Sequence, residues 1–282
     1  MLITLTGVGS LLASQSEEMR LKVSTRLFLI LFFLGFAGVL SFLLVDVSAL
    51  VALFPVPAGE TVPVITPWLK VVSVIQPAVL LAAAVLLGVL LAPRVGLHSP
   101  FFESVAAGHP ALLTLRPQLV PAVLGAAVGS LAILLTAAIS KHLFTPAVLE
   151  RIGTLQRLLP LPTRLLYGGI TEELLLRWGL MTVLAWIVWR LLQKGQGRPT
   201  STTLILAILI SSVVFGVGHL PLAIMLVGKP TAAIVFLVIV ANSAFGVVAG
   251  YLFWKYGLES AIIVHMLVHI VLVTASYLGA YF

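Results

Sequence analysis

The chain has 282 residues and a net charge of +7, and 61% of its residues are hydrophobic while only 9% are charged. Charged residues make up about a quarter of a soluble protein, so this composition excludes a water-soluble globular domain. It predicts an all-α protein, a polytopic transmembrane helical bundle. The apolar runs are unbroken, which excludes an outer-membrane barrel, and the lack of cysteine excludes disulfides and thiolate chemistry.

The basic residues are scattered over loops and helix ends, as the positive-inside rule expects of a membrane protein. We therefore expect a lipid bilayer as partner and no nucleic acid. The protein is predicted to be an integral, multi-pass membrane protein, located in the cell membrane if the source is prokaryotic.

Residues 1–26 are predicted to form an N-terminal interfacial segment. Residues 1–13 are apolar but too short to span a bilayer, which needs about 20 residues. No small-residue cleavage site follows them, so a cleaved signal peptide is not expected. Residues 27–140 are predicted to hold the N-terminal transmembrane helices, with spans at about 27–45, 71–92 and 119–139 and a proline-rich loop after the first.

The second half of the chain is predicted to begin with an amphipathic surface segment over residues 141–164, where charged and apolar residues alternate. Residues 165–282 are predicted to form a motif-bearing transmembrane core. Its spans lie at about 165–192, from 203 to a break at Pro221, at 231–254 and from 260 onward. This gives seven spans, or eight if an interfacial segment crosses the membrane.

Three ionisable residues lie close together in the stretch TEELLLRWG, residues 171–179. Each charge at the centre of a membrane helix costs roughly 2.5–3.5 kcal/mol, so the three need partners or a function. Glu173 and Arg177 are four apart with the acid first, the favourable order for an ion pair. Glu172 is rotated about 100° from Glu173, and its i+4 neighbour is Leu176, so it has no local partner. It is therefore the catalytic candidate; the alternative is that all three form a packing cluster.

Three histidines and an asparagine lie within later predicted spans. Phe215 and His219 share one helix face, and so do His265 and His269, because each pair is four residues apart. His219 alone is also compatible with a buried core histidine. His265 and His269 are interpreted either as metal ligands or as donors to an oxyanion. Asn242 is expected to orient a histidine or to bond across helices.

These residues occur in the order Glu172-Glu173-x-x-x-Arg177, Phe215-x-x-x-His219 and His265-x-x-x-His269. The order resembles the successive motifs EExxxR, FxxxH and HxxxN or HxxxD of the CPBP family. This family contains the CAAX prenyl proteases of the Ras-converting-enzyme type and their bacteriocin-processing and abortive-infection relatives. The resemblance covers roughly residues 164–271.

The resemblance implies an intramembrane, glutamate-dependent endopeptidase in which Glu172 activates a water with help from His219. His265 and His269 would stabilise the oxyanion. The structural support would come from Glu173, Arg177, Phe215 and Asn242. The implied substrate is a peptide or protein, which is prenylated in a CAAX role.

His269 departs from the family pattern, since Asn or Asp is usual there, although a neutral imidazole still has an N–H to donate. The departure leaves zinc open as an alternative cofactor, because Glu172, His219, His265 and His269 form a nitrogen and oxygen ligand set. No HExxH sequence is present, which excludes a zincin-type site. We favour chemistry without a metal or other cofactor.

Two other functions are compatible with the same residues. One is a non-proteolytic membrane scaffold or immunity-type member of the family. The other is a proton-coupled transporter in which Glu172 and the histidines relay protons, although the chain contains no inverted repeat to support it. In a simple seven-span arrangement His265 enters the membrane from the face opposite to Glu172 and His219. The three residues would therefore meet only near mid-membrane.

Overall fold

The computed structural model describes residues 5–54 and 66–279, with the side chains of residues 17–54, 66, 68 and 70–279. Most of the predicted proline-rich loop and the first four residues of the predicted interfacial segment therefore lie outside the described residues. Within the described residues the chain forms helices and no strand, which confirms the all-α prediction. The first half contains α1 (Leu5–Ser41), η1 (Phe42–Leu44), α2 (Val47–Val51), α3 (Pro67–Val95), α4 (Pro100–Ala107), η2 (Leu112–Leu115) and α5 (Arg116–Leu143). The second half contains α6 (Pro146–Leu158), α7 (Leu161–Thr163), η3 (Arg164–Thr171), η4 (Leu174–Met181), α8 (Thr182–Gln193), α9 (Ser201–Gly218), α10 (Leu220–Val227), α11 (Ala232–Tyr256) and α12 (Leu258–Tyr277).

Seven helical stretches among the described residues are long and apolar enough to cross a membrane. This number agrees with the seven predicted spans, and the protein is an integral, multi-pass membrane protein. The stretches are Glu17–Leu44, Lys70–Val95, Leu112–Leu143, Leu161–Gln193, Ser201–Val227, Ala232–Tyr256 and Leu258–Tyr277.

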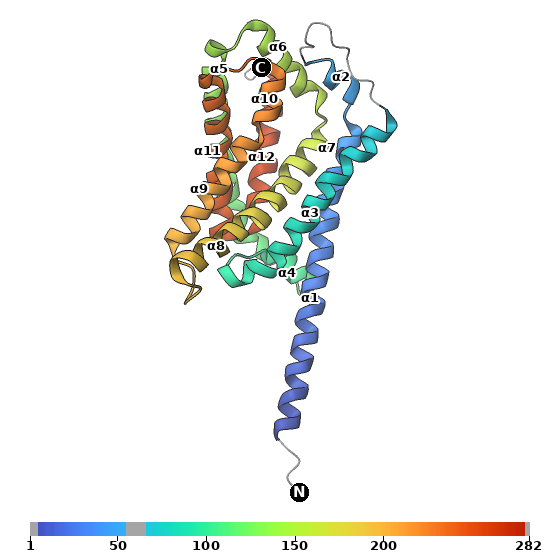
Figure 1. Ribbon diagram of the computed structural model, residues 1–282, viewed down its shortest axis with the longest axis vertical. Coiled ribbons are helices and arrows are strands. Elements are labelled where there is room, and N and C mark those ends of the chain that lie inside the picture. Colours follow the sequence, from blue (N-terminus) through green and yellow to red (C-terminus); the bar gives the residue numbers. More distant parts are fainter. Residues whose placement is uncertain (1–4, 55–65, 280–282) are drawn as a thin grey trace.

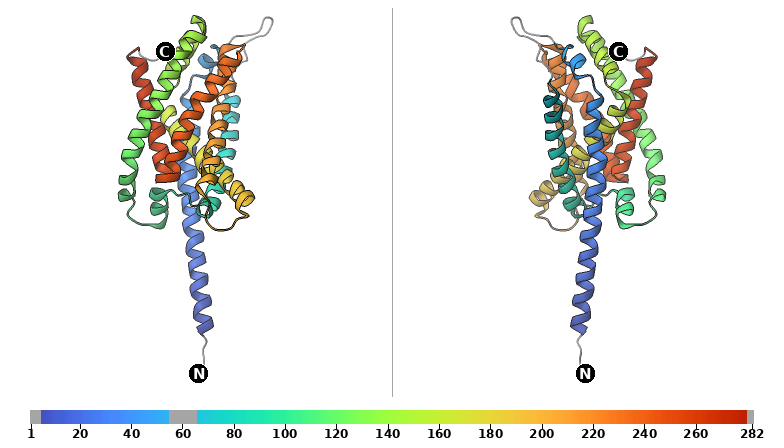
Figure 2. Two further views of the ribbon diagram at one scale, coloured as in Figure 1. Left: turned by 90° about the vertical axis from the view of Figure 1, so that its left-hand side faces the viewer. Right: turned by 90° about the vertical axis from the view of Figure 1, so that its right-hand side faces the viewer.

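Helix α1 runs without a break through the predicted boundary at residue 26. Its N-terminal half projects beyond one end of the bundle, while its C-terminal half packs inside it (Figures 1 and 2). No proline interrupts this helix. The interfacial placement of residues 1–26 stays a prediction.

The fourth span is the centre of the bundle and is partly π-helical. Segments η3 and η4 have the wider π geometry, and the two glutamates 172 and 173 lie between them. At this junction the N–H of Glu172 donates to the carbonyl of Tyr167, five residues earlier. π-Turns of this kind are rare and occur often at functional sites.

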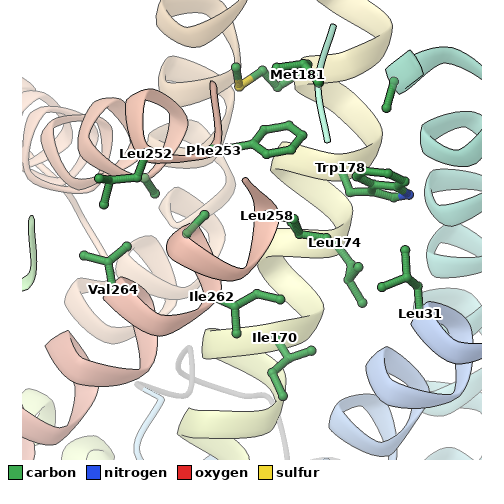
Figure 3. Packing of buried hydrophobic residues seen from close by; sticks show 14 of the residues in the cluster. Leu31, Ile170, Leu174, Trp178, Met181, Leu252, Phe253, Leu258, Ile262 and Val264 are labelled. Carbon is green, nitrogen blue, oxygen red and sulfur yellow. The ribbon is translucent and has the colours of Figure 1, made fainter. Parts of the chain in front are cut away.

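The apolar side of this central span packs against helices from both halves of the chain (Figure 3). Trp178 is fully buried, and its indole N–H donates to the carbonyl of Val85 in α3 at 3.3 Å. On the α1 side, Thr171 donates to the carbonyl of Gly35 at 2.7 Å, and a Cβ on Gly38 would lie 2.1 Å from the same hydroxyl. Small residues therefore let α1 approach the central span closely, as in other membrane helix pairs.

A buried carboxylate joins two distant elements at the end of the bundle that holds α4. Oε1 of Glu259, in the first turn of α12, accepts hydrogen bonds from the Ser99 hydroxyl at 2.7 Å and the N–H groups of Phe101 and Phe102 at 3.0 and 3.1 Å. Its other oxygen accepts from Gln118 at 3.3 Å. Glu259 thus satisfies the unpaired N–H groups at the start of α4 and fixes where α12 begins.

The opposite end of the bundle is roofed by α6 and α10. Helix α6 lies across this end (Figure 1), within the segment 141–164 that was predicted to be amphipathic. Its Arg151 donates to the carbonyl of Leu226 in α10 at 3.1 Å. Beyond α6, the buried Arg164 donates to the carbonyls of Leu159 and Gln156 and to the Gln156 side chain.

Candidate active site

A cavity of about 520 Å³ lies beneath the roof formed by α6 and α10. It contains six of the eight residues singled out from the sequence: Glu172, Phe215, His219, Asn242, His265 and His269. The other two, Glu173 and Arg177, are buried behind its wall. Most of the remaining lining is apolar and comes from α5, α6, α10 and α11.

Glu172 and His265 meet although they enter the membrane from opposite ends. The Glu172 Oε2 atom lies 3.9 Å from Nε2 of His265. The Glu172 side chain keeps 22% of its surface exposed, whereas that of Glu173 keeps none. Of the two adjacent carboxylates, Glu172 is therefore the one that substrate or water in the cavity can reach.

Glu173 forms the predicted ion pair and a second contact that the sequence did not reveal. Its Oε2 lies 3.2 Å from Nε of Arg177. Its Oε1 lies 2.7 Å from Nδ1 of His265. Arg177 is a fixed cation, so Glu173 acts as a carboxylate and Nδ1–H of His265 is the donor in this bond. Glu173 therefore orients His265 as well as pairing with Arg177.

His219 is held by the break between α9 and α10. The His219 N–H bonds to Gly216 rather than to Phe215, which leaves the Phe215 carbonyl without its usual helical donor. This carbonyl accepts from Nδ1 of the His219 ring at 2.8 Å. Since a carbonyl only accepts, Nδ1 carries the hydrogen, and Nε2 of the neutral ring is an acceptor.

Two phenylalanine rings separate Arg177 from the imidazoles. The Arg177 guanidinium carbon lies 4.9 Å from the centre of the Phe215 ring and 6.0 Å from that of Phe245. The ring of His219 lies 4.7 Å from Phe215, and that of His265 lies 4.5 Å from Phe245. Cation–π contacts thus add to the ion pair in holding the buried guanidinium.

His269 faces the cavity one helical turn beyond His265, with its ring nearly parallel to that of His265 at 4.9 Å. Neither nitrogen of His269 has a hydrogen-bond partner among the described residues. A Cβ on Gly168 would lie 2.4 Å from its Nε2, so only glycine at 168 leaves room for this ring.

Among the described residues, Asn242 makes neither of the contacts expected of it. It lines the cavity, but its amide donates to the carbonyl of Val238, one turn earlier in its own helix, at 2.8 Å. The described hydrogen bonds of Asn242 therefore include none to a histidine or to another helix.

Three residues that shape the site were not predicted from the sequence: Tyr167, Gly168 and Arg164. Tyr167 lines the cavity one π-turn before Glu172. Gly168 admits His269, and Arg164 secures the end of the roof. Of these residues only Gly168 had a distinctive sequence pattern, because it forms a glycine pair with Gly169 shortly before the acidic pair.

The fold and the site define a helical membrane protein with a carboxylate and three imidazoles gathered in one cavity within its spans. Residues 154–271, which hold every residue of this site, match the family model described as Type II CAAX prenyl endopeptidase Rce1-like. This part of the chain is similar to that family of CAAX-type peptidases, and the match confirms the resemblance seen in the sequence. Comparison with curated proteins and with solved structures gives no match.

Proposed function

We propose that this protein is an intramembrane endopeptidase that hydrolyses a peptide bond with a water activated by Glu172. One observation carries the proposal. Glu172 opens onto the cavity 3.9 Å from His265, while Glu173 beside it is fully buried and engaged by His265 and Arg177. The two glutamates thus divide into an accessible base and a buried support.

The residues have distinct parts in the proposed reaction. Glu172 accepts a proton from water, Nε2 of His219 accepts the water's other hydrogen bond, and the water oxygen attacks the peptide carbonyl carbon. His265, which Glu173 orients, and His269 are the residues that stabilise the oxyanion. Glu172 then returns the proton to the departing amide nitrogen as the C–N bond breaks.

We propose that this chemistry proceeds without a metal ion. Nδ1 of His265 is engaged by Glu173 and Nδ1 of His219 by the Phe215 carbonyl, so each ring offers a single nitrogen to the cavity. Across the described part of the chain, no three His, Cys, Asp or Glu side chains are placed to hold an ion. This placement supports chemistry without a metal ion over the zinc alternative.

The proposed substrate is a membrane-associated peptide or protein. The apolar walls of the cavity suit an apolar side chain or a lipid group attached to the substrate. Whether this group is a prenyl chain is tested by pairs of peptides that differ only in a farnesylated cysteine.

The decisive variant is Glu172→Gln, assayed with internally quenched peptides and protein in liposomes. An amide cannot take the proton, so we expect the rate to fall at least 10²–10⁴-fold, the usual contribution of a general base. Glu17→Gln, in the exposed part of α1, is the matched control and should cleave normally. The wild-type rate should also survive a zinc chelator.

A Glu172→Gln variant that cleaves at the wild-type rate contradicts the proposal. A wild type that cleaves nothing, with a phenotype that survives loss of both Glu172 and His219, favours the scaffold instead. Proton-coupled uptake into vesicles that both substitutions abolish favours the transporter.

A further inference from the structure

The fourth and seventh spans run in opposite directions and build the site in two levels. Glu172 lies level with His265, as their 3.9 Å separation shows. One turn earlier on the fourth span, Gly168 lies against Nε2 of His269, which is one turn later on α12. The second level therefore contains Gly168 and His269, and it lies on the side of Glu172 that faces the roof.

Tyr167 places a phenol in this second level. The hydrogen bond from Glu172 N–H to the Tyr167 carbonyl puts the two residues one π-turn apart on the same side of the span, and both side chains line the cavity. In a regular α-helix residues five apart point in different directions, so the π-turn is what aligns them.

The Tyr167 ring is held firmly, but its hydroxyl is not engaged. The ring of Phe42 packs edge-on against it, with the ring centres 4.5 Å apart and the planes at 84°. No hydrogen bond joins the phenol to any other described residue, and its oxygen is not sealed from the cavity. Tyr167 is half-buried, and a phenol in the cavity lining whose O–H no described residue engages is a donor available to substrate.

We propose that Tyr167 is a catalytic residue of this site, which donates its O–H to the substrate carbonyl oxygen as that oxygen becomes negative. The inference rests on the proposed function. Tyr167 supplies a donor at the level of His269, which stands where the family pattern has Asn or Asp. No described residue orients either nitrogen of His269 by a hydrogen bond. A phenol rotates its hydrogen toward the acceptor without such an orienting bond.

The test is Tyr167→Phe, which removes the hydroxyl and keeps the ring that packs on Phe42. Loss of one oxyanion donor typically lowers kcat by roughly 10²–10³-fold, and a donor used only in the transition state leaves KM unchanged. Tyr251→Phe, on the exposed face of α11, is the matched control and should keep both constants. Thermal unfolding of each variant in detergent should match that of the wild type.

A second measurement separates this role from a structural one. A peptide aldehyde, whose hydrate resembles the tetrahedral intermediate, should bind Tyr167→Phe less tightly by the same factor as the fall in kcat. The corresponding peptide alcohol should bind both forms equally. An unchanged kcat, or a rise in KM alone, overturns the assignment of Tyr167 as an oxyanion donor.

The two proposals fail in different ways. If the wild type cleaves, Glu172→Gln does not and Tyr167→Phe cleaves like the wild type, only the Tyr167 assignment is wrong. If the wild type and Glu172→Gln are equally active or equally inactive, the proposed function is wrong and the Tyr167 assignment falls with it.

Discussion

Charged side chains are costly to bury inside a membrane, and in this protein the contacts of Glu173 offset part of that cost. Glu173 lies between Arg177 and His265, so one carboxylate satisfies a cation in its own helix and an imidazole in another. Arg177 also donates to the carbonyl of Gly246 in α11 at 3.2 Å. The buried charges therefore connect three helices.

This network predicts a strong coupling between Glu173 and Arg177. Arg177→Leu leaves a buried carboxylate without its cation, and removal of one partner from a buried pair costs roughly 3–5 kcal/mol of unfolding free energy. Glu173→Gln leaves the guanidinium unpaired and should cost a similar amount. The double variant should lose much less than the sum, because neither charge is then left alone.

Denaturant unfolding in mixed micelles measures the four free energies of this cycle. Arg198→Leu, on the exposed loop before α9, is the control and should change the unfolding free energy by less than about 0.5 kcal/mol. Additive losses in the double variant would show that the pair is not an energetic unit.

At this scale the sequence predicted the acid–base pair because an i, i+4 spacing acts within one helix. It did not predict the contact between Glu173 and His265, which are 92 residues apart. Such a contact depends on the rotation of two helices about their axes, which an apolar membrane helix does not reveal in its sequence. Asn242 illustrates the same gap, since its amide turned back to its own helix.

At the scale of the helix, the π-turns of the fourth span and the glycines before the acidic pair decide how α12 docks. Gly168 and Gly169 lie against His269 and Met266 of α12, where a Cβ on either glycine would approach within 2.4 Å. This close contact brings α12 against the fourth span, where both of its histidines line the cavity. Helix packing thus brings motifs that are far apart in the sequence together in one site.

Gly168→Ala should therefore push the His269 ring out of its place. We expect a loss of roughly 1–3 kcal/mol of unfolding free energy, as for other overpacked sites, together with a lower cleavage rate. His269→Ala removes the obstructing ring, so the double variant Gly168→Ala/His269→Ala should be more stable than the two single losses predict when added.

Thermal unfolding in detergent checks this expectation. Gly218→Ala is the matched control, because nothing lies within 4 Å of the position its Cβ would take. If Gly168→Ala is as stable and as active as the wild type, the close approach of His269 to the central span is not required.

At this scale the positions of the spans were predictable and their local geometry was not. Length and apolar content located all seven spans, and Pro221 marked the break after His219. The π-turns were missed because they need no special residue type, so Tyr167 looked like any other partly buried aromatic. The packing of α1 through Gly35 and Gly38 likewise has no signal outside the folded structure.

Across the whole molecule, the cavity lies toward the end of the bundle that α6 and α10 roof. Its lining includes residues from the roof but none from α4 or from the loop between α8 and α9. The roofed end lies opposite to the end from which α1 projects (Figure 1). The side of the membrane that the cavity faces therefore depends on which end of the bundle lies in the cytoplasm.

The basic residues predict that orientation. Nine Lys and Arg residues lie at the end that holds α4: Arg20, Lys22, Arg26, Arg94, Arg116, Arg190, Lys194, Arg198 and Lys255. Six lie at the roofed end: Lys70, Lys141, Arg151, Arg157, Arg164 and Lys229. This excess predicts that the α4 end lies in the cytoplasm, so the cavity should face the other side.

Single cysteines test this orientation directly, because the chain has none of its own. His109→Cys and Ala147→Cys are both exposed and flank the span formed by α5. In intact cells that express the protein, a membrane-impermeant maleimide should label Ala147→Cys, and it should label His109→Cys only after permeabilisation. The reverse pattern would place the cavity on the cytoplasmic side. Labelling of both positions in intact cells would contradict a membrane span between them.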